Sequence, residues 1–248
     1  MSNIFAGARA WASELTALGI AFLVFLAIRI LVLQPFTIPS DSAEPTLRVG
    51  DYVIVSKSSY GWSRHSVPFG LAPFHGRLLG RSPNRGDVIV FKLPRDGRTD
   101  YVKRLIGLPG DRVQLVHGVV FVNGVPLRQK VLGPTTDPDQ PSRPVIAIRE
   151  TLPDGRGHVI LREAAERDGE TTGVYRVPEG QYFFLGDNRD DSLDSRWPRA
   201  VGVGFVPAEN LEGKAEFIAF AWRGGAALLK PWTWVSRFDP GRMFQKVA

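Results

Sequence analysis

The sequence predicts a mainly β fold behind one N-terminal membrane helix. Short runs of β-branched and aromatic residues, bounded by Gly, Pro or Asp, are typical of strands. Asn123-Gly124 is a strong signal for a two-residue hairpin turn. One apolar run near the N-terminus is long enough to cross a bilayer. The predicted strands cover residues 53–55, 88–91, 113–122 (with His117-Gly118 at the centre), 145–148, 159–161, 182–185 and 215–222.

The apolar run from Leu15 to Leu33 spans about 29 Å at about 1.5 Å per residue, the thickness of a hydrocarbon core. Arg29 is its one charged residue and lies near the end, where its long stem can reach the interface. Pro35 is expected to end the helix. The alternative is a cleavable signal peptide, whose apolar region usually has about 7–15 residues. The predicted organisation is an N-terminal segment 1–14, a transmembrane helix 15–34 and one domain 35–248.

Composition limits the chemistry of the domain. The 248-residue chain has no cysteine, which excludes disulfides, thiol catalysis and thiolate metal sites. The net charge of +6 suits anionic lipid, and without a clustered basic run no nucleic-acid partner is expected. No metal or cofactor is predicted, because the histidines show no ligand spacing. Surface or loop positions are predicted for all four, His65, His75, His117 and His158.

Two segments carry candidate catalytic groups. Ser42 lies in a proline-braced turn shortly after the apolar run, and Lys103 lies inside the predicted strand 101–106. Side-chain alternation puts Lys103 on one face with Tyr101 and Leu105, while Arg104 points to the other. A buried lysine whose pKa falls from about 10.4 to roughly 7–8 can serve as the base for a serine nucleophile. The alternatives are a capping serine and a surface lysine.

A third segment, Gly186–Arg196, is polar and follows the strand 182–185. Taken alone, it equally fits a solvated loop. Together with the serine turn, the lysine strand and the strands at 51–57 and 85–91, it resembles the ordered motifs of the bacterial type I signal peptidases. These membrane-bound Ser/Lys endopeptidases remove signal peptides from exported preproteins. The resemblance implies a signal-peptidase/repressor-autoprotease-like β-fold. The stretch from Leu132 to Gly173 is rich in Pro, Asp, Gly and Arg and contains two of the predicted strands, which predicts an inserted β-subdomain at about 125–176.

By that resemblance Ser42 is the nucleophile and Lys103 the general base. The Ser40 hydroxyl and the Ser42 N–H would form the oxyanion hole, and Ser192 would orient the lysine amine. Ion pairs that brace the site would involve Arg104, Asp187, Asp194 and Arg196. The shallow substrate pockets, which accept small residues in an A-x-A-like pattern, would be lined by Phe36, Ile38, Pro39, Ala43, Leu47, Tyr101 and Val102.

The resemblance also places the chain in the cell. The N-terminus would lie in the cytoplasm and the catalytic domain on the periplasmic side of the bacterial inner membrane. Expected partners are signal peptides of exported preproteins and membrane lipid, with the secretion translocon as a further candidate. Tryptophans between Leu228 and Phe238 suit either the membrane interface or packing on the β domain.

The chain departs from the family at Asp41 and Ala43, where glycine and methionine are usual. A carboxylate at Asp41 that faces Lys103 would raise the lysine pKa, whereas one that faces water would matter little. Three alternatives stay open. They are a weakened membrane-anchored binding or assembly module, a specialised maturation peptidase of the same family, and a self-cleaving repressor. A repressor would need a DNA-binding motif in place of the apolar run.

Overall fold

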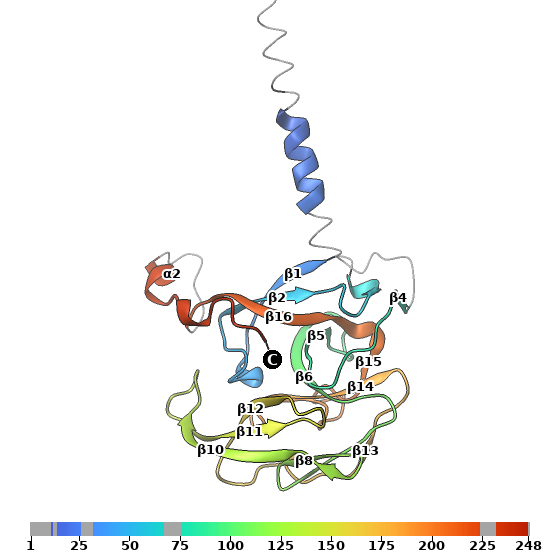
Figure 1. Ribbon diagram of the computed structural model, residues 1–248, viewed down its shortest axis with the longest axis vertical. Helices are drawn as coiled ribbons and strands as arrows, with labels where there is room; N and C mark the ends of the chain where they lie inside the picture. Colours follow the sequence, from blue (N-terminus) through green and yellow to red (C-terminus); the bar gives the residue numbers. More distant parts are fainter. Residues whose placement is uncertain (1–10, 12–13, 26–31, 67–75, 224–231, 248) are drawn as a thin grey trace, which may run out of the picture.

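The computed structural model describes residues 11, 14–25, 32–66, 76–223 and 232–247. Residues 14–25 are helical, and the rest of the described chain is mainly β, as predicted (Figure 1). Within these ranges, no helix combines the length and the apolar character needed to cross a membrane. The predicted span runs through residues 26–31, so this stretch, with Arg29, lies outside the described residues.

The predicted end of the membrane helix is wrong. Val32 is in a turn, and Leu33 already begins strand β1 (Leu33–Thr37), which pairs antiparallel with β2 (Asp51–Ser56). Pro35 therefore lies within a strand and does not terminate a helix. Its missing N–H is tolerated because β1 is at the edge of its sheet. The last residue of the apolar run, Leu33, thus belongs to the sheet.

In the described part of the chain, seven strands form the main sheet, in the order β1-β2-β16-β5-β6-β14-β15 (Figure 1). Each of the pairings is antiparallel, and β16 carries bulges against both β2 and β5. Bulges bend a strand and increase its twist, which lets the sheet curl. Beyond β1 and β2, its strands are β16 (Leu211–Ala221), β5 (Val88–Lys92), β6 (Asp100–Gly107), β14 (Gln181–Leu185) and β15 (Val206–Pro207).

Two of the smaller sheets lie on the opposite side of the domain from β1 and β2 (Figure 1). One has the order β13-β7-β8-β9, another the order β10-β11-β12, and β3 pairs with β4. The strands are β3 (Trp62–Ser63), β4 (Arg77–Leu78), β7 (Arg112–Val116), β8 (Val119–Val122), β9 (Val125–Pro126), β10 (Arg128–Thr136), β11 (Pro144–Thr151), β12 (Gly157–Arg162) and β13 (Tyr175–Arg176). The short helices are η1 (Asp41–Ala43), η2 (Arg64–Ser66), η4 (Ala208–Asn210), α2 (Trp232–Ser236) and η5 (Pro240–Arg242).

The predicted hairpin turn is confirmed. Asn123 and Gly124 both have positive φ, 54° and 82°, and connect β8 to β9. His117 and Gly118, at 47° and 74°, connect β7 to β8 in the same way. Positive φ at both central residues is the geometry that matches the twist of paired strands.

The smaller sheets are joined to the loop that follows β14. Leu161 of β12 forms a bridge with Asn188, and its N–H donates to the Asp187 carbonyl over 2.9 Å. The Arg189 N–H donates in turn to the Leu161 carbonyl over 2.9 Å. The loop 186–196 is therefore held between the main sheet and β12.

Candidate active site

Ser42 lies in η1, on the chain that leads from β1 to β2. Ser42 is 8% exposed, and its carbonyl oxygen accepts a hydrogen bond from the Asn188 N–H over 3.2 Å. The turn is closed by the Glu44 N–H, which donates to the Asp41 carbonyl over 2.9 Å. The position of the serine is thus fixed both by its own turn and by the loop 186–196.

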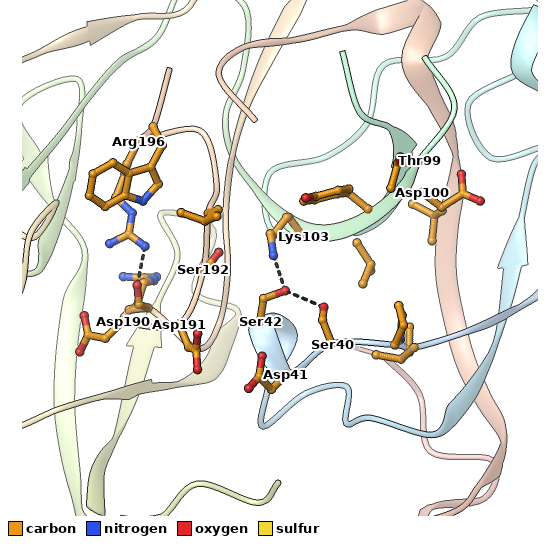
Figure 2. Close-up of a pocket in the computed structure, with 18 of the residues that line it drawn as sticks. Ser40, Asp41, Ser42, Thr99, Asp100, Lys103, Asp190, Asp191, Ser192 and Arg196 are labelled. Atoms are coloured by element: carbon orange, nitrogen blue, oxygen red, sulfur yellow. Dashed lines mark hydrogen bonds between the residues drawn. The ribbon is translucent and has the colours of Figure 1, made fainter. Parts of the chain in front are cut away.

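Lys103 reaches Ser42 from β6. A hydrogen bond joins Lys103 Nζ to Ser42 Oγ (Figure 2). Lys103 is 2% exposed, and its Nζ lies 5.7 Å from the centre of the Tyr101 ring, which places the two residues on one face of the strand. Burial lowers the pKa of Lys103 to about 8, against the opposing influence of Asp194, Asp187 and Asp41.

Two bidentate ion pairs surround this contact. Arg104 Nε and Nη2 donate to the two carboxylate oxygens of Asp187 over 2.8 and 2.7 Å. Arg196 Nε and Nη2 donate to the carboxylate of Asp194 over 2.8 and 2.9 Å. Burial raises the pKa of each carboxyl group, but the arginine, together with His158 and Thr46 at Asp187 and with the Gly186 N–H and Lys103 at Asp194, outweighs burial, so the pKa of each is lowered.

The other two serines of the predicted site lie close to it. Ser40 Oγ is 3.3 Å from Ser42 Oγ, and either hydroxyl can donate. Ser192 lines the same cleft, but its buried hydroxyl oxygen has no hydrogen-bond partner among the described residues. The predicted bond from Ser192 to the lysine amine is therefore not formed in this structure.

Gly186 explains how closely the loop approaches Ser42. A Cβ atom at this position would lie 2.5 Å from the Ser42 carbonyl oxygen and would also collide with Ser192. A glycine lets the two backbones approach to a distance that any side chain would prevent.

The dyad opens into a cleft of about 490 Å³. Part of its wall is apolar and comes from β1, β5 and β6. Acidic residues face the cleft as well, including Asp41, Asp190 and Asp191. Of the residues predicted to line substrate pockets, the cleft includes Phe36, Ile38, Pro39, Tyr101 and Val102.

Two predicted pocket residues, Ala43 and Leu47, are not among the residues that line this cleft. Ala43 and Leu47 are 4% and 0% exposed and belong to the core under the site, packed with Ile38 and Val53. The short helix turns Ser42 toward the cleft and the next side chain inward. Ala43 therefore does not widen the wall of the cleft.

The predicted surface or loop position of His158 is also wrong. His158 lies in β12, is 5% exposed, and has Nε2 3.4 Å from Glu150 and 4.0 Å from Asp187. Burial lowers the pKa of His158, against the opposing influence of the two carboxylates. His117 is exposed as predicted, whereas His75 is outside the described residues.

Sequence analysis also missed several groups around the site. Val90, Thr99, Asp168 and Trp197 line the cleft, and the buried pair of Glu150 and Arg189 holds the loop from below. Alternation in the strand 88–91 could have identified Val90, but the other contacts join segments far apart in sequence. Within the described ranges, no cluster of three or more His, Cys, Asp or Glu side chains is arranged for a metal ion.

One known protein family matches most of the chain. The profile of the family described as "Signal peptidase, peptidase S26" matches residues 10–221. The chain belongs to this family. It is therefore a peptidase, a hydrolase of the signal peptidase type.

Similar proteins cover most of the chain. The signal peptidase I of Rickettsia typhi is 41% identical over 84% of this chain and 84% of its own length. The signal peptidase I of Rickettsia felis is 43% identical over 80% of this chain and 76% of its own length. A signal peptidase I of solved structure, from Enterococcus faecalis V583, is 30% identical, with a TM-score of 0.33, and covers 54% of this chain and 97% of that one.

Proposed function

We propose that this signal peptidase cleaves exported preproteins with a Ser42–Lys103 dyad, after small residues in an A-x-A-like pattern. The observation that supports the dyad most is the hydrogen bond between Lys103 Nζ and Ser42 Oγ inside a buried site. With a pKa of about 8, roughly a tenth of the lysine is neutral at pH 7 and able to accept a proton.

The reaction follows from these positions. Ser42 Oγ attacks the scissile carbonyl carbon while its proton passes to the neutral Lys103 amine. The oxyanion that forms is stabilised by the Ser42 N–H and by the Ser40 hydroxyl, which turns from Ser42 Oγ toward it. The Lys103 ammonium then protonates the departing amine, and the amine base activates water to hydrolyse the acyl-enzyme.

The loop 186–196 and its ion pairs have a positioning role in this proposal. Arg104 with Asp187, and Arg196 with Asp194, hold the loop against β6. Ser192 would meet the lysine amine once substrate closes the site, since catalytic hydrogen bonds often tighten only in the complex.

The substrate would bind as an added strand. Residues 100–103 of β6 pair with β5 on one side, whereas β14 pairs only with Arg104, Leu105 and Gly107. The free edge beside Lys103 faces the cleft, so an extended peptide can pair with it. Phe36, Ile38, Val90, Tyr101 and Val102 would then limit the size of the residues before the scissile bond.

We also propose a membrane location with residues 1–14 in the cytoplasm and the domain on the periplasmic side of the inner membrane. The proposed span would begin near Leu15 and end before β1, which starts at Leu33, and this would place Ser42 close to the bilayer. The exposed Trp232 and Trp234 of α2, 66% and 46% exposed, suit contact with lipid headgroups. We further propose that residues 125–176 form an inserted β-subdomain and that the secretion translocon is a partner of the domain.

The test uses the detergent-solubilised full-length chain and a preprotein with an A-x-A site. We expect cleavage at that site, with loss of activity in Ser42→Ala and full activity in the control Ser82→Ala, whose side chain is exposed. A folded wild type that binds the preprotein without cutting it would contradict the dyad and favour the binding module.

A further inference from the structure

The turn between β10 and β11, residues 137–143, reaches back to the nucleophile turn, which is the short helix η1 with Ser42. It is ordered internally, because the Asp137 carboxylate accepts the N–H groups of Asp139 and Gln140 over 3.1 and 3.0 Å. It is also tied to the segment after η1, since the Val49 N–H donates to the Asp139 carboxylate over 3.0 Å. The turn therefore presents Gln140 at a defined place beside the active site.

Gln140 bridges the two segments that form the site. Its Nε2 donates to Asp41 Oδ2 over 3.0 Å and to Asp191 Oδ2 over 3.3 Å. Asp41 comes directly before Ser42, whereas Asp191 comes directly before Ser192. Arg143 Nη1, from the same turn, also donates to Asp191, over 2.5 Å.

The bridge opposes a repulsion. Asp41 and Asp191 are close enough that, after burial, the charge of Asp41 is the next cause of the raised pKa of Asp191. Arg143 compensates only in part, because its guanidinium is shared with Asp137 and Glu163. Without the Gln140 amide, the two carboxylates would move apart.

The direction in which Asp41 moves matters for the base. Figure 2 shows the Asp41 carboxylate on the far side of Ser42 from the Lys103 amine. Even there, its charge contributes to raising the pKa of Lys103. A carboxylate released from Gln140 can turn toward the lysine, where it would stabilise the ammonium that cannot act as a base.

We infer that Gln140 is a positioning residue, which holds the Asp41 carboxylate on the side of the β10–β11 turn and so keeps it away from Lys103. This role rests on the proposed dyad and deepens it. It also accounts for Asp41, at a position where the family usually has glycine, because the β10–β11 turn of this chain supplies the Gln140 amide as a hydrogen-bond donor for the Asp41 carboxylate.

The charged groups around Asp41 and Lys103 determine how the pKa of Lys103 should respond when Gln140 is replaced. The charged groups that act on Lys103 are Asp194, Arg196, Asp187 and Asp41, and of these four the Gln140 amide contacts Asp41. Removal of the Gln140 amide therefore changes one of the four influences and leaves the two arginine–aspartate pairs in place.

The test is the pH dependence of kcat/KM for cleavage of the A-x-A preprotein by the full-length chain. Gln140→Ala is expected to move the acid limb up by about half a pH unit, the size expected for one carboxylate that comes closer by a few ångströms. Asp41→Gly is expected to move it down, and Gln140→Ala added to Asp41→Gly should have no further effect. The control Gln245→Ala, whose amide bonds the Gly241 carbonyl, should leave the profile unchanged.

A loss of fold alone would lower the melting temperature and the activity at every pH, equally in both backgrounds at position 41. Two results would overturn the inference. In one, Gln140→Ala shifts the acid limb by the same amount in the wild type and in Asp41→Gly. In the other, Gln140→Ala shifts the acid limb in neither protein. The proposed dyad is tested separately, in the protein that keeps Gln140. If the wild type does not cleave the preprotein, or if Ser42→Ala still cleaves it, the dyad fails whatever the Gln140 variants show.

Discussion

Lys103 shows how one residue obtains its chemistry from its place in a strand. Its position on β6 removes the amine from water, while its Nζ stays in contact with Ser42. The acidic groups nearby limit the effect of burial, so its pKa is lowered to about 8 and no further. A fully apolar site would leave the amine a weaker base.

Gly186 allows the loop to touch the nucleophile, and its replacement is a sharp test of that contact. Gly186→Ala is expected to cost about 1–3 kcal/mol of unfolding free energy, because the added methyl group collides with the Ser42 carbonyl and Ser192. We expect kcat to fall as well. Urea denaturation and cleavage assays check both effects.

Gly173→Ala is the matched control, since no atom lies within 4 Å of an added Cβ there. A Gly186→Ala protein as stable and as active as Gly173→Ala would contradict the close packing of the loop on Ser42.

The candidate reactive residues could be proposed from the sequence, but only from several motifs taken together. A serine in a turn and a lysine in an apolar strand each fit an ordinary structural role, and it is the ordered set of motifs, with its resemblance to the signal peptidases, that singles out Ser42 and Lys103. The core positions of Ala43 and Leu47 could not be predicted, because a turn has no periodicity from which to infer the direction of a side chain. His158 was assigned to the surface because its carboxylate neighbours, Glu150 and Asp187, are distant or on another element.

The elements of the smaller sheets support the catalytic loop through a buried charge network. Arg189 of the loop pairs with Glu150 of β11, and both are at most 2% exposed. Burial alone raises the pKa of Glu150, but Arg189 and His158 outweigh it and lower the pKa below its ordinary value. The carboxylate is therefore charged and depends on its partners.

Arg189→Met is expected to destabilise the protein by about 3–5 kcal/mol, because it leaves the Glu150 carboxylate buried without its cation. Addition of Glu150→Gln should recover much of this loss. Chemical denaturation of the single and double variants measures the coupling, and equal instability of both would contradict an electrostatic role.

Glu44 connects the nucleophile turn to the β10–β11 turn in another way. It is fully buried, and burial together with Asp139 and Asp137 raises its pKa to about 10. The folded chain therefore holds a proton on Glu44 at neutral pH, whereas the unfolded chain releases it above about pH 4.5.

The sign of the pH dependence follows. Between about pH 4.5 and 10 the folded state binds one more proton than the unfolded state, so Glu44 makes the free energy of unfolding fall as pH rises. The contribution is at most about 1.4 kcal/mol per pH unit. Glu44→Gln should flatten this slope in denaturation experiments between pH 6 and 9, and an unchanged slope would show that Glu44 is ionised in the folded state.

The whole molecule combines an apolar N-terminal run with a β domain whose edge strand begins where that run ends. The mainly β class and most strands could be predicted, since they depend on local patterns. The helix end could not, because residues such as Leu33 and Gln34 suit a helix or an edge strand equally, and pairing with β2 decides between them.

The proposed anchor predicts that the full-length chain stays in the membrane fraction after alkaline carbonate extraction. Leu18→Lys together with Phe22→Lys should release much of it, since each lysine costs about 2.5–3.5 kcal/mol in a membrane helix. Lys130→Met, on an exposed residue of β10, serves as the control for a changed charge. Equal retention of the double-lysine variant would contradict a span through these residues.

The central claim is that Lys103 acts as an uncharged base for Ser42. The most direct measurement is the pH dependence of kcat/KM for preprotein cleavage, with Lys103→Met beside the control Lys130→Met. We predict an acid limb with a pKa of about 8 in the wild type and in the control, and a loss of activity of about 10²–10⁴-fold in Lys103→Met. An acid limb well below pH 7, or full activity in Lys103→Met, would contradict the assignment of the base.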